Sequence, residues 1–199
     1  CTLDETLEDV SNKITSVNIK NINKKDVTSN YDISYDFGTL TILPKEVKIP
    51  SNVCKHLTYN GKLQTITNDN QEGYYYVENT GINAGTYNLK IRLNSNYIWD
   101  DKTLSDRDAS CTINKINLVI TSLSSTKHYD GGILVNDNYS VNGSVLKDNK
   151  LYVNITGMIS EIGEVPNTID KVVIRDKYSK DVTSNYDITL KEGTLTIIK

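Results

Sequence analysis

One stretch of sequence occurs twice in this chain. Residues 7–42 align without a gap with residues 162–197, and about half of the 36 aligned positions are identical. Both copies contain the run DVTSNYDI and end in GTLTI. Chance hardly produces a gapless match of this length, so the chain is predicted to repeat a structural unit. A repeat has to be recognised first, because overlooking it leads to the wrong fold.

A second, shorter similarity marks where the units begin. Residues 41–61 resemble residues 112–131, since each has a Thr-Ile strand end, a V/L-x-I strand and then Tyr-Asn-Gly or Tyr-Asp-Gly. Asn-Gly and Asp-Gly favour tight turns because both residues tolerate positive φ. The sequence therefore predicts three modules, residues 1–44, 45–115 and 116–199.

The first of these modules matches only the C-terminal half of residues 116–199. We expect its front half to precede Cys1 in a longer parent chain, and the final GTLTIIK to run on into another module. Upstream and downstream modules of the same parent are therefore predicted partners. Half a module cannot bury its apolar face alone, so residues 1–44 are expected to be partly disordered or to lean on a neighbour.

Strand patterns dominate the local sequence. In residues 86–93 the side chains alternate between apolar and polar, which is typical of a strand with one buried face. Similar short runs stand between Gly, Asn and Asp turns, and only residues 3–10 and 100–106 could form short helical turns. The predicted fold class is all-β, with tandem small β-sandwich modules of Ig-like or related topology and an incomplete first module.

Composition and missing motifs exclude several classes of function. The net charge of −3 supplies no basic field for nucleic acid. No apolar run approaches the roughly 20 residues of a membrane helix. The three Cys show no CxxC spacing, and the sequence contains no GxSxG, no HExxH and no Gly-rich phosphate loop. No catalytic residue, metal site or cofactor is predicted, so we expect no enzyme.

Two aromatic residues are candidate ligand contacts. Tyr75 and Trp99 could stack on a sugar if their rings share an exposed face. The alternative places the rings in the core, because Tyr74/Tyr76 and Tyr97/Trp99 are each spaced as inward-facing strand residues are. In that case Tyr75 points to solvent.

Acidic residues offer two weak candidates for calcium. Residues 68–73 resemble the start of a calcium loop but lack the bidentate Glu, because Asn79 stands at that position. The second candidate is an aspartate cluster at residues 100–108. A solvated polar loop explains both stretches better.

The motifs resemble repeats of bacterial surface proteins. YNGKLQ, NAGTY, YIWDD and the closing CTI of residues 45–115 are similar to the Ig-like repeats of large Firmicutes surface proteins. The outer units, with YDG and NYDI followed by GTLTI, resemble the MBG/YDG-type repeats of bacterial adhesins and wall-anchored proteins. The resemblance implies extracellular stalk or spacer modules, sometimes attached to secreted enzymes, without catalytic residues or cofactors. Cys111 departs from the pattern, since such repeats often carry Trp or another large residue there.

The Ig-like resemblance also bears on the cysteines. Cys54 and Cys111 fall in the first and last strands of the middle module, and an Ig-like topology often places those strands side by side. A disulfide there would close 57 residues and add ~4 kcal/mol on the chain-entropy account. The alternative is two free buried thiols, because Firmicutes surface proteins seldom use disulfides. Cys1 has no evident partner; it could be the lipid-bearing residue of a processed lipoprotein, but the half-repeat directly after it favours a boundary placed inside a longer chain.

Two functions follow as expectations. The first is a non-catalytic structural or adhesive spacer of a secreted or cell-wall-attached bacterial surface protein. The second is a carbohydrate- or host-protein-binding module appended to a secreted enzyme, whose partner is an extracellular glycan or host protein. An exposed aromatic surface would favour the second function, whereas buried rings would favour the first.

Overall fold

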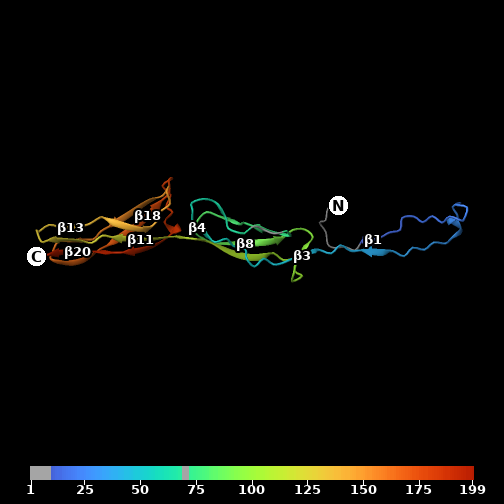
Figure 1. Cartoon of the computed structure of the whole chain (residues 1–199), viewed down its shortest axis with the longest axis horizontal. Helices are drawn as coiled ribbons and strands as arrows, with labels where there is room; N and C mark the ends of the chain where they lie inside the picture. The colour runs from blue at the N-terminus through green and yellow to red at the C-terminus, as the bar shows by residue number, and fades with distance from the viewer. Residues whose placement is uncertain (1–9, 69–71) are drawn as a thin grey trace. The chain divides into compact units, whose positions relative to one another are not determined.

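The computed structural model describes residues 10–68 and 72–199, and these residues form an all-β protein (Figure 1). In this part of the chain the helical elements are two short 3₁₀ turns, η1 (Thr28–Asn30) and η2 (Thr183–Asn185). None of the described helical segments has the length or apolar character needed to cross a bilayer. The strands are β1 (Val10–Asn12), β2 (Gly38–Leu40), β3 (Lys45–Val47), β4 (Leu57–Thr58), β5 (Gln64–Thr65), β6 (Tyr74–Val77), β7 (Thr80–Gly81), β8 (Gly85–Leu93), β9 (Tyr97–Trp99), β10 (Arg107–Asn114), β11 (Ile116–Ser122), β12 (Ser125–His128), β13 (Leu134–Val135), β14 (Tyr139–Gly143), β15 (Lys150–Ile155), β16 (Met158–Ile159), β17 (Gly163–Asn167), β18 (Ile169–Arg175), β19 (Tyr186–Lys191) and β20 (Gly193–Ile198).

The chain divides into two compact units. Their limits cross the module boundaries expected from the sequence, because β3 and β9 of the expected middle module fall in the first unit. Unit 1 comprises Cys1–Ile49, Gln71–Tyr75 and Arg92–Asp106, and unit 2 comprises Pro50–Asn70, Tyr76–Ile91 and Arg107–Lys199.

Unit 1 contains two strand pairs. β1 and β2 pair antiparallel, with Val10 opposite Leu40. β3 and β9 pair in parallel, with Val47 opposite Trp99. Trp99 is fully buried and packs on the ring of Tyr74, with 5.8 Å between ring centroids. A large aromatic side chain thus supplies the core of a unit whose strands are only three residues long.

Among the described residues the longest strand is β8, and its alternation is the one expected from the sequence. Leu89 and Ile91 are buried while Asn88 and Lys90 are exposed, which confirms the prediction for residues 86–93. The sheet that contains β8 has the strand order β4-β10-β8-β6, with β10 antiparallel to β8 and parallel to β4.

The two stretches in which we allowed for short helices have different outcomes. Residues 100–106 form turns without a helix, and Lys102 there has a positive φ of 67°. The other stretch, residues 3–10, lies outside the described residues except for Val10, which begins β1.

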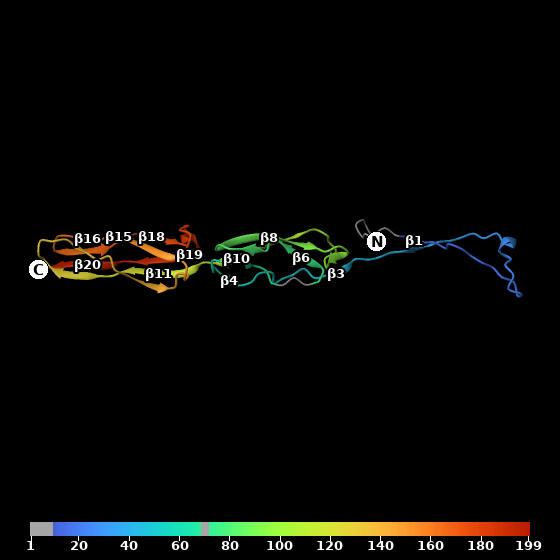
Figure 2. The ribbon, with the colours of Figure 1, turned by 90° about the horizontal axis from the view of Figure 1, so that it is seen from above.

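Residues 116–199 form several small sheets (Figure 2). β11 lies between β14 and β19, and β20 lies between β12 and β17. The pairs β11–β19 and β12–β20 are parallel, so the front of this repeat supplies partner strands for its back. The buried side chains at the centre of these strands are Leu118, Ile120, Leu195 and Ile197.

The two copies of the sequence repeat have the same local backbone pairing. Val10 pairs with Leu40 in the first copy, and the equivalent Val165 pairs with Leu195 in the second. The isolated bridge between Lys20 and Asp26 recurs 155 residues later between Arg175 and Asp181. The repeated sequence therefore directs the same local structure in both places.

A shared turn explains why the DVTSNY run adopts the same shape twice. In the first copy Thr28 Oγ1 donates to Asp26 Oδ1 at 2.6 Å and accepts from the backbone N–H of Ile19 at 2.8 Å. Thr183 makes both bonds in the second copy, to Asp181 and Ile174, at the same distances. Hydrogen bonds from each threonine hydroxyl, and then from its backbone N–H, lower the pKa of each aspartate.

The copies differ in what covers them. Leu40 is 53% exposed and Tyr31 is 57% exposed, whereas their equivalents Leu195 and Tyr186 are 0% and 3% exposed. In the second copy β11 pairs with β19 and β12 pairs with β20. Among the described residues, 13–19 and 31–37 are not in strands, although their equivalents contain β18 and β19. Burial and full strand pairing therefore depend on the front half of the repeat.

This contrast makes a matched prediction. Leu195→Ala should lower the free energy of unfolding by about 2–5 kcal/mol, because it opens a cavity in a closed core. Leu40→Ala, the same change at the equivalent exposed position, should lower it by less than about 0.5 kcal/mol. Urea unfolding of the two variants measures both values, and equal losses would contradict the difference in burial.

Candidate functional site

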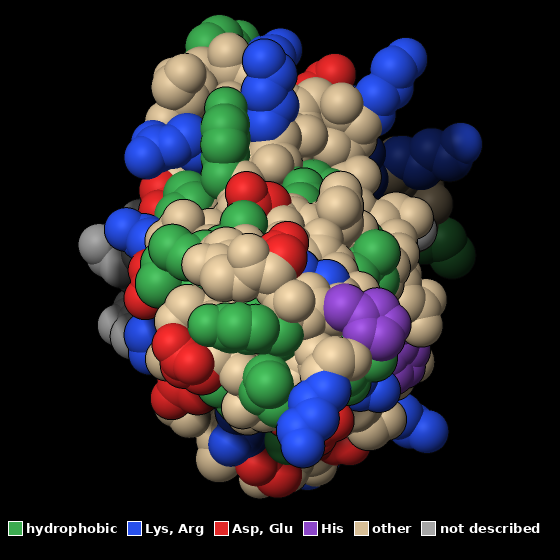
Figure 3. Space-filling view, turned by 90° about the vertical axis from the view of Figure 1, so that its left-hand side faces the viewer, with side chains coloured by type: hydrophobic (Ala, Val, Ile, Leu, Met, Phe, Trp, Pro, Cys, Tyr) green, Lys and Arg blue, Asp and Glu red, His purple; other side chains and the backbone are tan. Residues whose placement is uncertain are grey.

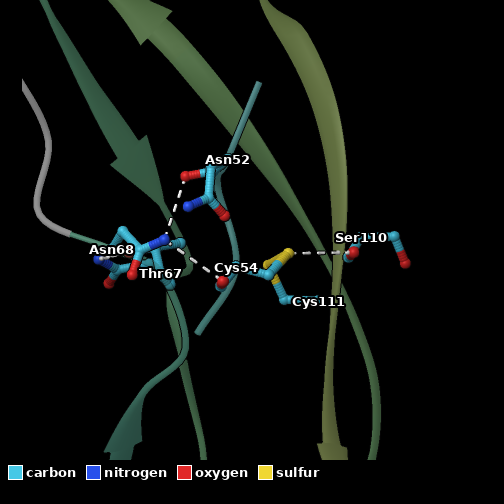
Figure 4. Close-up of a disulfide and its surroundings, with 7 residues drawn as sticks. Asn52, Cys54, Thr67, Asn68, Ser110 and Cys111 are labelled. Atoms are coloured by element: carbon cyan, nitrogen blue, oxygen red, sulfur yellow. Dashed lines mark hydrogen bonds between the residues drawn. A yellow bond between two sulfur atoms is a disulfide. The ribbon is translucent and has the colours of Figure 1, made fainter. Parts of the chain in front are cut away.

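A disulfide joins Cys54 and Cys111, which lie near the two ends of residues 45–115 (Figure 4). We call residues 45–115 the middle segment. Cys54 and Cys111 are bonded, their Cα atoms are 5.3 Å apart, and the bond spans 57 residues. Cys111 is a buried residue of β10, and Cys54 forms an isolated bridge with Thr67. The side chain of Asn68 donates to the backbone oxygens of Asn52 and Cys54, at 3.1 and 3.3 Å. The covalent bond thus ties the start of this segment to its last strand.

The two candidate ligand-binding residues have different environments. Trp99 is 0% exposed, and its Nε1–H donates to the backbone oxygen of Ser105 at 2.9 Å. Tyr75 is 38% exposed, while Tyr74 on the other face of β6 is buried. Trp99 therefore presents no ring face to a ligand, and Tyr75 is the member of the pair that lies at the surface.

The acidic side chains at residues 100–108 are engaged by neighbours within the protein. Asp106 pairs with the guanidinium of Arg92, with a shortest distance of 2.9 Å, and this bond raises the pKa of Arg92. Asp108 Oδ1 lies 3.0 Å from Lys90 Nζ. Asp101 accepts hydrogen bonds from the hydroxyl and backbone N–H of Thr103.

No group of three or more metal-ligating side chains gathers in the part of the chain that the structure describes. The other calcium candidate, residues 68–73, lies partly outside the described residues.

A small polar cluster links strands β3 and β9. Glu72 Oε1 accepts a hydrogen bond from Tyr97 Oη at 2.6 Å and lies 2.9 Å from Lys45 Nζ. The bond from Tyr97 is the main cause that lowers the pKa of Glu72, followed by the contact with Lys45. The same bond raises the pKa of Tyr97, because ionising the phenol would place two negative charges side by side. These exposed polar contacts through Glu72 link β3 to β9.

Unit 2 contains a contact between the middle segment and the C-terminal repeat, which we call the joint (Tyr59, Asn83, Ala84, Asn185 and Tyr186). Asn185 is buried, and its Oδ1 accepts from the backbone N–H of Ala84 at 2.7 Å. Its Nδ2 donates to Asn83 Oδ1 at 3.3 Å. One side chain thus satisfies two polar groups of the NAGTY turn.

Two tyrosine rings make the apolar part of the joint. Tyr59 and Tyr186 pack edge to face, with 5.9 Å between ring centroids, and both are buried. Burial raises the pKa of Tyr59, and the neighbouring Tyr186 adds to this effect. Tyr186 Oη accepts from Asn149 Nδ2 at 2.8 Å and from the backbone N–H of Leu146 at 3.2 Å. The Tyr186 ring therefore belongs both to the C-terminal core and to the joint.

The backbone connection beside the joint is short. β10 ends at Asn114 and β11 begins at Ile116, so Lys115 alone separates the two strands. Tyr59 N–H donates to the Asn114 oxygen at 2.9 Å, which holds the end of β10 in place. A single-residue connection with hydrogen bonds on both sides leaves little freedom for bending.

Sequence reasoning did not identify the joint. The Asn-Tyr pair was used there only to mark the repeat, and the NAGTY turn only to recognise a family resemblance. Both features are polar and aromatic groups held at fixed places in tight turns, a signal that could have suggested a contact. The sequence contains no indication of which turn meets which.

The remaining surface lacks a deep site in the described part of the chain. A shallow depression on unit 2 is lined by the short side chains of Asn88, Asp108, Ala109 and Ser110, and Lys90 already pairs with Asp108. On the face shown in Figure 3, acidic, basic and apolar side chains lie interspersed. That mixture agrees with the small net charge of −3.

Comparison with known proteins adds no relative. No protein-family model, no curated protein and no solved structure matches the chain. The functional argument therefore depends on the contacts of the chain itself.

The disulfide predicts a simple chemical result. Under denaturing, non-reducing conditions a thiol alkylating reagent should modify one cysteine, Cys1, and after reduction it should modify three. Intact mass measures both states. Cys54→Ala/Cys111→Ala should lower the free energy of unfolding by about 2–5 kcal/mol, because the open chain regains conformational entropy when it unfolds. Three modified cysteines before reduction would contradict the bond.

The joint predicts an asymmetry between equivalent residues. Asn185→Ala should lower the free energy of unfolding by about 1–3 kcal/mol, because it leaves the half-buried Ala84 N–H without its acceptor. Asn30→Ala is the matched control, since Asn30 occupies the equivalent place in the first copy and is exposed. Thermal and urea unfolding should show almost no change for the control. Equal effects would mean that the loss reflects the 3₁₀ turn and not the joint.

Proposed function

We propose that this chain is a non-catalytic structural spacer, made of β repeats, in a secreted or cell-wall-attached bacterial surface protein. Its task is to hold other parts of the parent protein at a distance and in a fixed direction. The joint is the observation that carries the proposal, because it couples the middle segment to the C-terminal repeat through partly buried hydrogen bonds and a buried pair of tyrosine rings.

The joint suits a spacer for a physical reason. A one-residue connection at Lys115 limits translation, and the two hydrogen bonds of Asn185 oppose rotation of one segment against the other. Buried polar groups are costly when unpaired, so any bend that breaks these bonds is penalised. A flexible linker would have no such penalty. The contacts therefore favour a stiff connection between repeats.

The distribution of aromatic rings also supports a spacer. Trp99, Tyr74, Tyr59 and Tyr186 are buried, and each contributes to packing within its own unit. A carbohydrate platform needs ring faces that are open to solvent. The proposed modules are small β-sandwiches of Ig-like or related topology, in which such rings fill thin cores.

The disulfide gives this spacer resistance to extension. If the middle segment unfolds under load, the Cys54–Cys111 bond holds back the chain between the two cysteines, which are separated by 57 positions. Reduction would free this stretch and lengthen the extended chain by about 190–205 Å, at 3.3–3.6 Å per residue. An oxidised extracellular setting suits this arrangement, because disulfides persist there.

The alternative, a carbohydrate- or host-protein-binding module, has exposed aromatic rings in its favour. Tyr75 presents part of its ring on the outer face of β6. Tyr35 and Phe37 are also exposed, and their rings stack with 6.1 Å between centroids. The shallow depression described above is lined by none of these rings, so the spacer is the better supported function.

The spacer proposal predicts shared orientation across the joint. Residual dipolar couplings of the middle segment around β8 and β10 and of residues 116–199 should fit one alignment tensor. Asn185→Ala should separate the tensors, and Asn30→Ala should leave them shared. Independent tensors in the unmodified chain would refute a stiff spacer.

Binding measurements test the alternative directly. The full chain should show no saturable binding on a glycan array, and Tyr75→Ala should change nothing. Glycan binding that is lost in Tyr75→Ala would instead favour the binding module.

A further inference from the structure

The first copy of the repeat has an apolar surface that its second copy buries. We call it the open face (Ile14, Tyr31, Leu40 and Ile42). These side chains are 46–65% exposed. Their equivalents, 155 residues later, are each 5% exposed or less; they are Ile169, Tyr186, Leu195 and Ile197. Because the local backbone pairing is the same, the difference lies in the front half of the repeat, residues 116–159, which covers the second copy.

The surroundings of Gly38 show more specifically what is missing from the first copy. A Cβ at its equivalent, Gly193, would lie 2.5–2.7 Å from backbone atoms of residues 122–124, so that position requires glycine. A Cβ at Gly38 would meet nothing within 4 Å, and Gly38 has no positive φ to justify a glycine. The free first copy therefore has no steric need for glycine at this position. The need would appear if a backbone segment approached Gly38 as residues 122–124 approach Gly193.

The polar groups that would receive such a segment are also present. In the second copy, Ser122 Oγ accepts from the Gly193 N–H at 3.0 Å and Ser124 Oγ accepts from the Thr194 N–H at 2.9 Å. Asn167 Nδ2 donates to the backbone oxygens of Leu123 and Asn136.

The first copy has Asn12, Gly38 and Thr39 at the positions equivalent to Asn167, Gly193 and Thr194, and these three residues are exposed. It thus offers two N–H donors and one amide to a Ser-x-Ser segment.

The backbone pairing of the two copies also indicates that the first copy can accept added strands. β18 and β19 pair with β15 and β11 of the front half. The equivalent residues of the first copy, within 13–19 and 31–37, are not in strands. Extended segments with unpaired edges accept an added strand readily, because its main chain satisfies their N–H and C=O groups.

We propose that residues 10–42 are a docking surface for a polypeptide segment with the chemistry of residues 116–159. That segment carries alternating apolar strands, a Ser-x-Ser turn that seats on Gly38, and two later strands that cover Leu40 and Ile42. The proposal rests on the spacer function and deepens it, since it makes the first copy an assembly point for repeats. A second copy of the chain is the less suitable donor, because its residues 116–159 already pair with its own back half.

A peptide of residues 116–159 tests the proposal on the full chain. Hydrogen exchange read by mass spectrometry or NMR should show saturable slowing of the amides of residues 31–42 when the peptide is added. Residues 186–197 should change little, because their site is filled within the chain. A peptide with Leu134→Asp should bind at least about tenfold more weakly, since a charge would then enter the apolar contact with Leu40 and Ile42.

Gly38→Ala is the decisive variant. It should leave the stability of the free chain unchanged and weaken peptide binding about tenfold, because the added methyl group would meet the incoming backbone. Asn23→Ala is the control, since Asn23 is equivalent to the exposed Tyr178 and should not affect binding. Equal binding to the unmodified chain and to Gly38→Ala would overturn the proposed seating.

A fusion of the segment to the chain tests the proposal even if the free peptide binds too weakly to be detected. Residues 116–159 placed ahead of residue 7 should slow exchange in residues 31–42, and Gly38→Ala should abolish that slowing. Unchanged exchange in the fused chain would overturn the proposal. Slowing that rises with chain concentration alone would overturn the choice of donor, because a second copy would then fill the open face. Neither outcome affects the orientation test of the spacer, which is measured at the joint of residues 59–186.

Discussion

The close approach of one backbone segment to Gly193 is the contact on which the complete repeat depends. Residues 122–124 lie so near that no side chain fits at Gly193, and the hydroxyls of Ser122 and Ser124 then bind its N–H and that of Thr194. This approach lets β12 pair with β20 and closes the core around Leu195. Among the described residues no segment approaches Gly38 in this way, and apolar side chains such as Leu40 stay exposed. The contact of residues 122–124 with Gly193 therefore distinguishes the second copy, whose apolar side chains are buried, from the first, whose equivalents are exposed.

Polar groups placed at turns join the middle segment to the C-terminal repeat. Asn185 ends a 3₁₀ turn and uses both ends of its amide on the NAGTY turn, and Tyr186 directly after it packs on Tyr59. Because Tyr186 also receives hydrogen bonds within the C-terminal repeat, the joint is anchored in a core. The Cys54–Cys111 bond closes the neighbouring segment covalently. These features are the ones on which the proposed spacer function rests.

The aromatic residues show how much of a candidate site the spacing of side chains along a strand can predict. Period-two spacing correctly separated Tyr74 from Tyr75, because alternate side chains of a strand must point to opposite faces. The same spacing could not say whether Trp99 faces a core or a ligand, since that depends on what lies opposite, and the structure places Tyr74 there. The alternation of β8 was predicted from residues 86–93 alone. The joint was not predicted, because Asn83 and Asn185 are 102 residues apart and no local rule pairs them.

The sequence by itself determined the all-β character, the alternation of the strands and the shared turn of the two copies, because these follow from contacts between residues close in the chain. Asp26 and Thr28 build the same turn as Asp181 and Thr183 wherever that run occurs. Only the tertiary structure decided which copy has a core, which cysteines bond and which asparagine couples two repeats. Those outcomes depend on segments that come together from distant parts of the chain, and identical local sequence therefore ends in burial for Leu195 and exposure for Leu40.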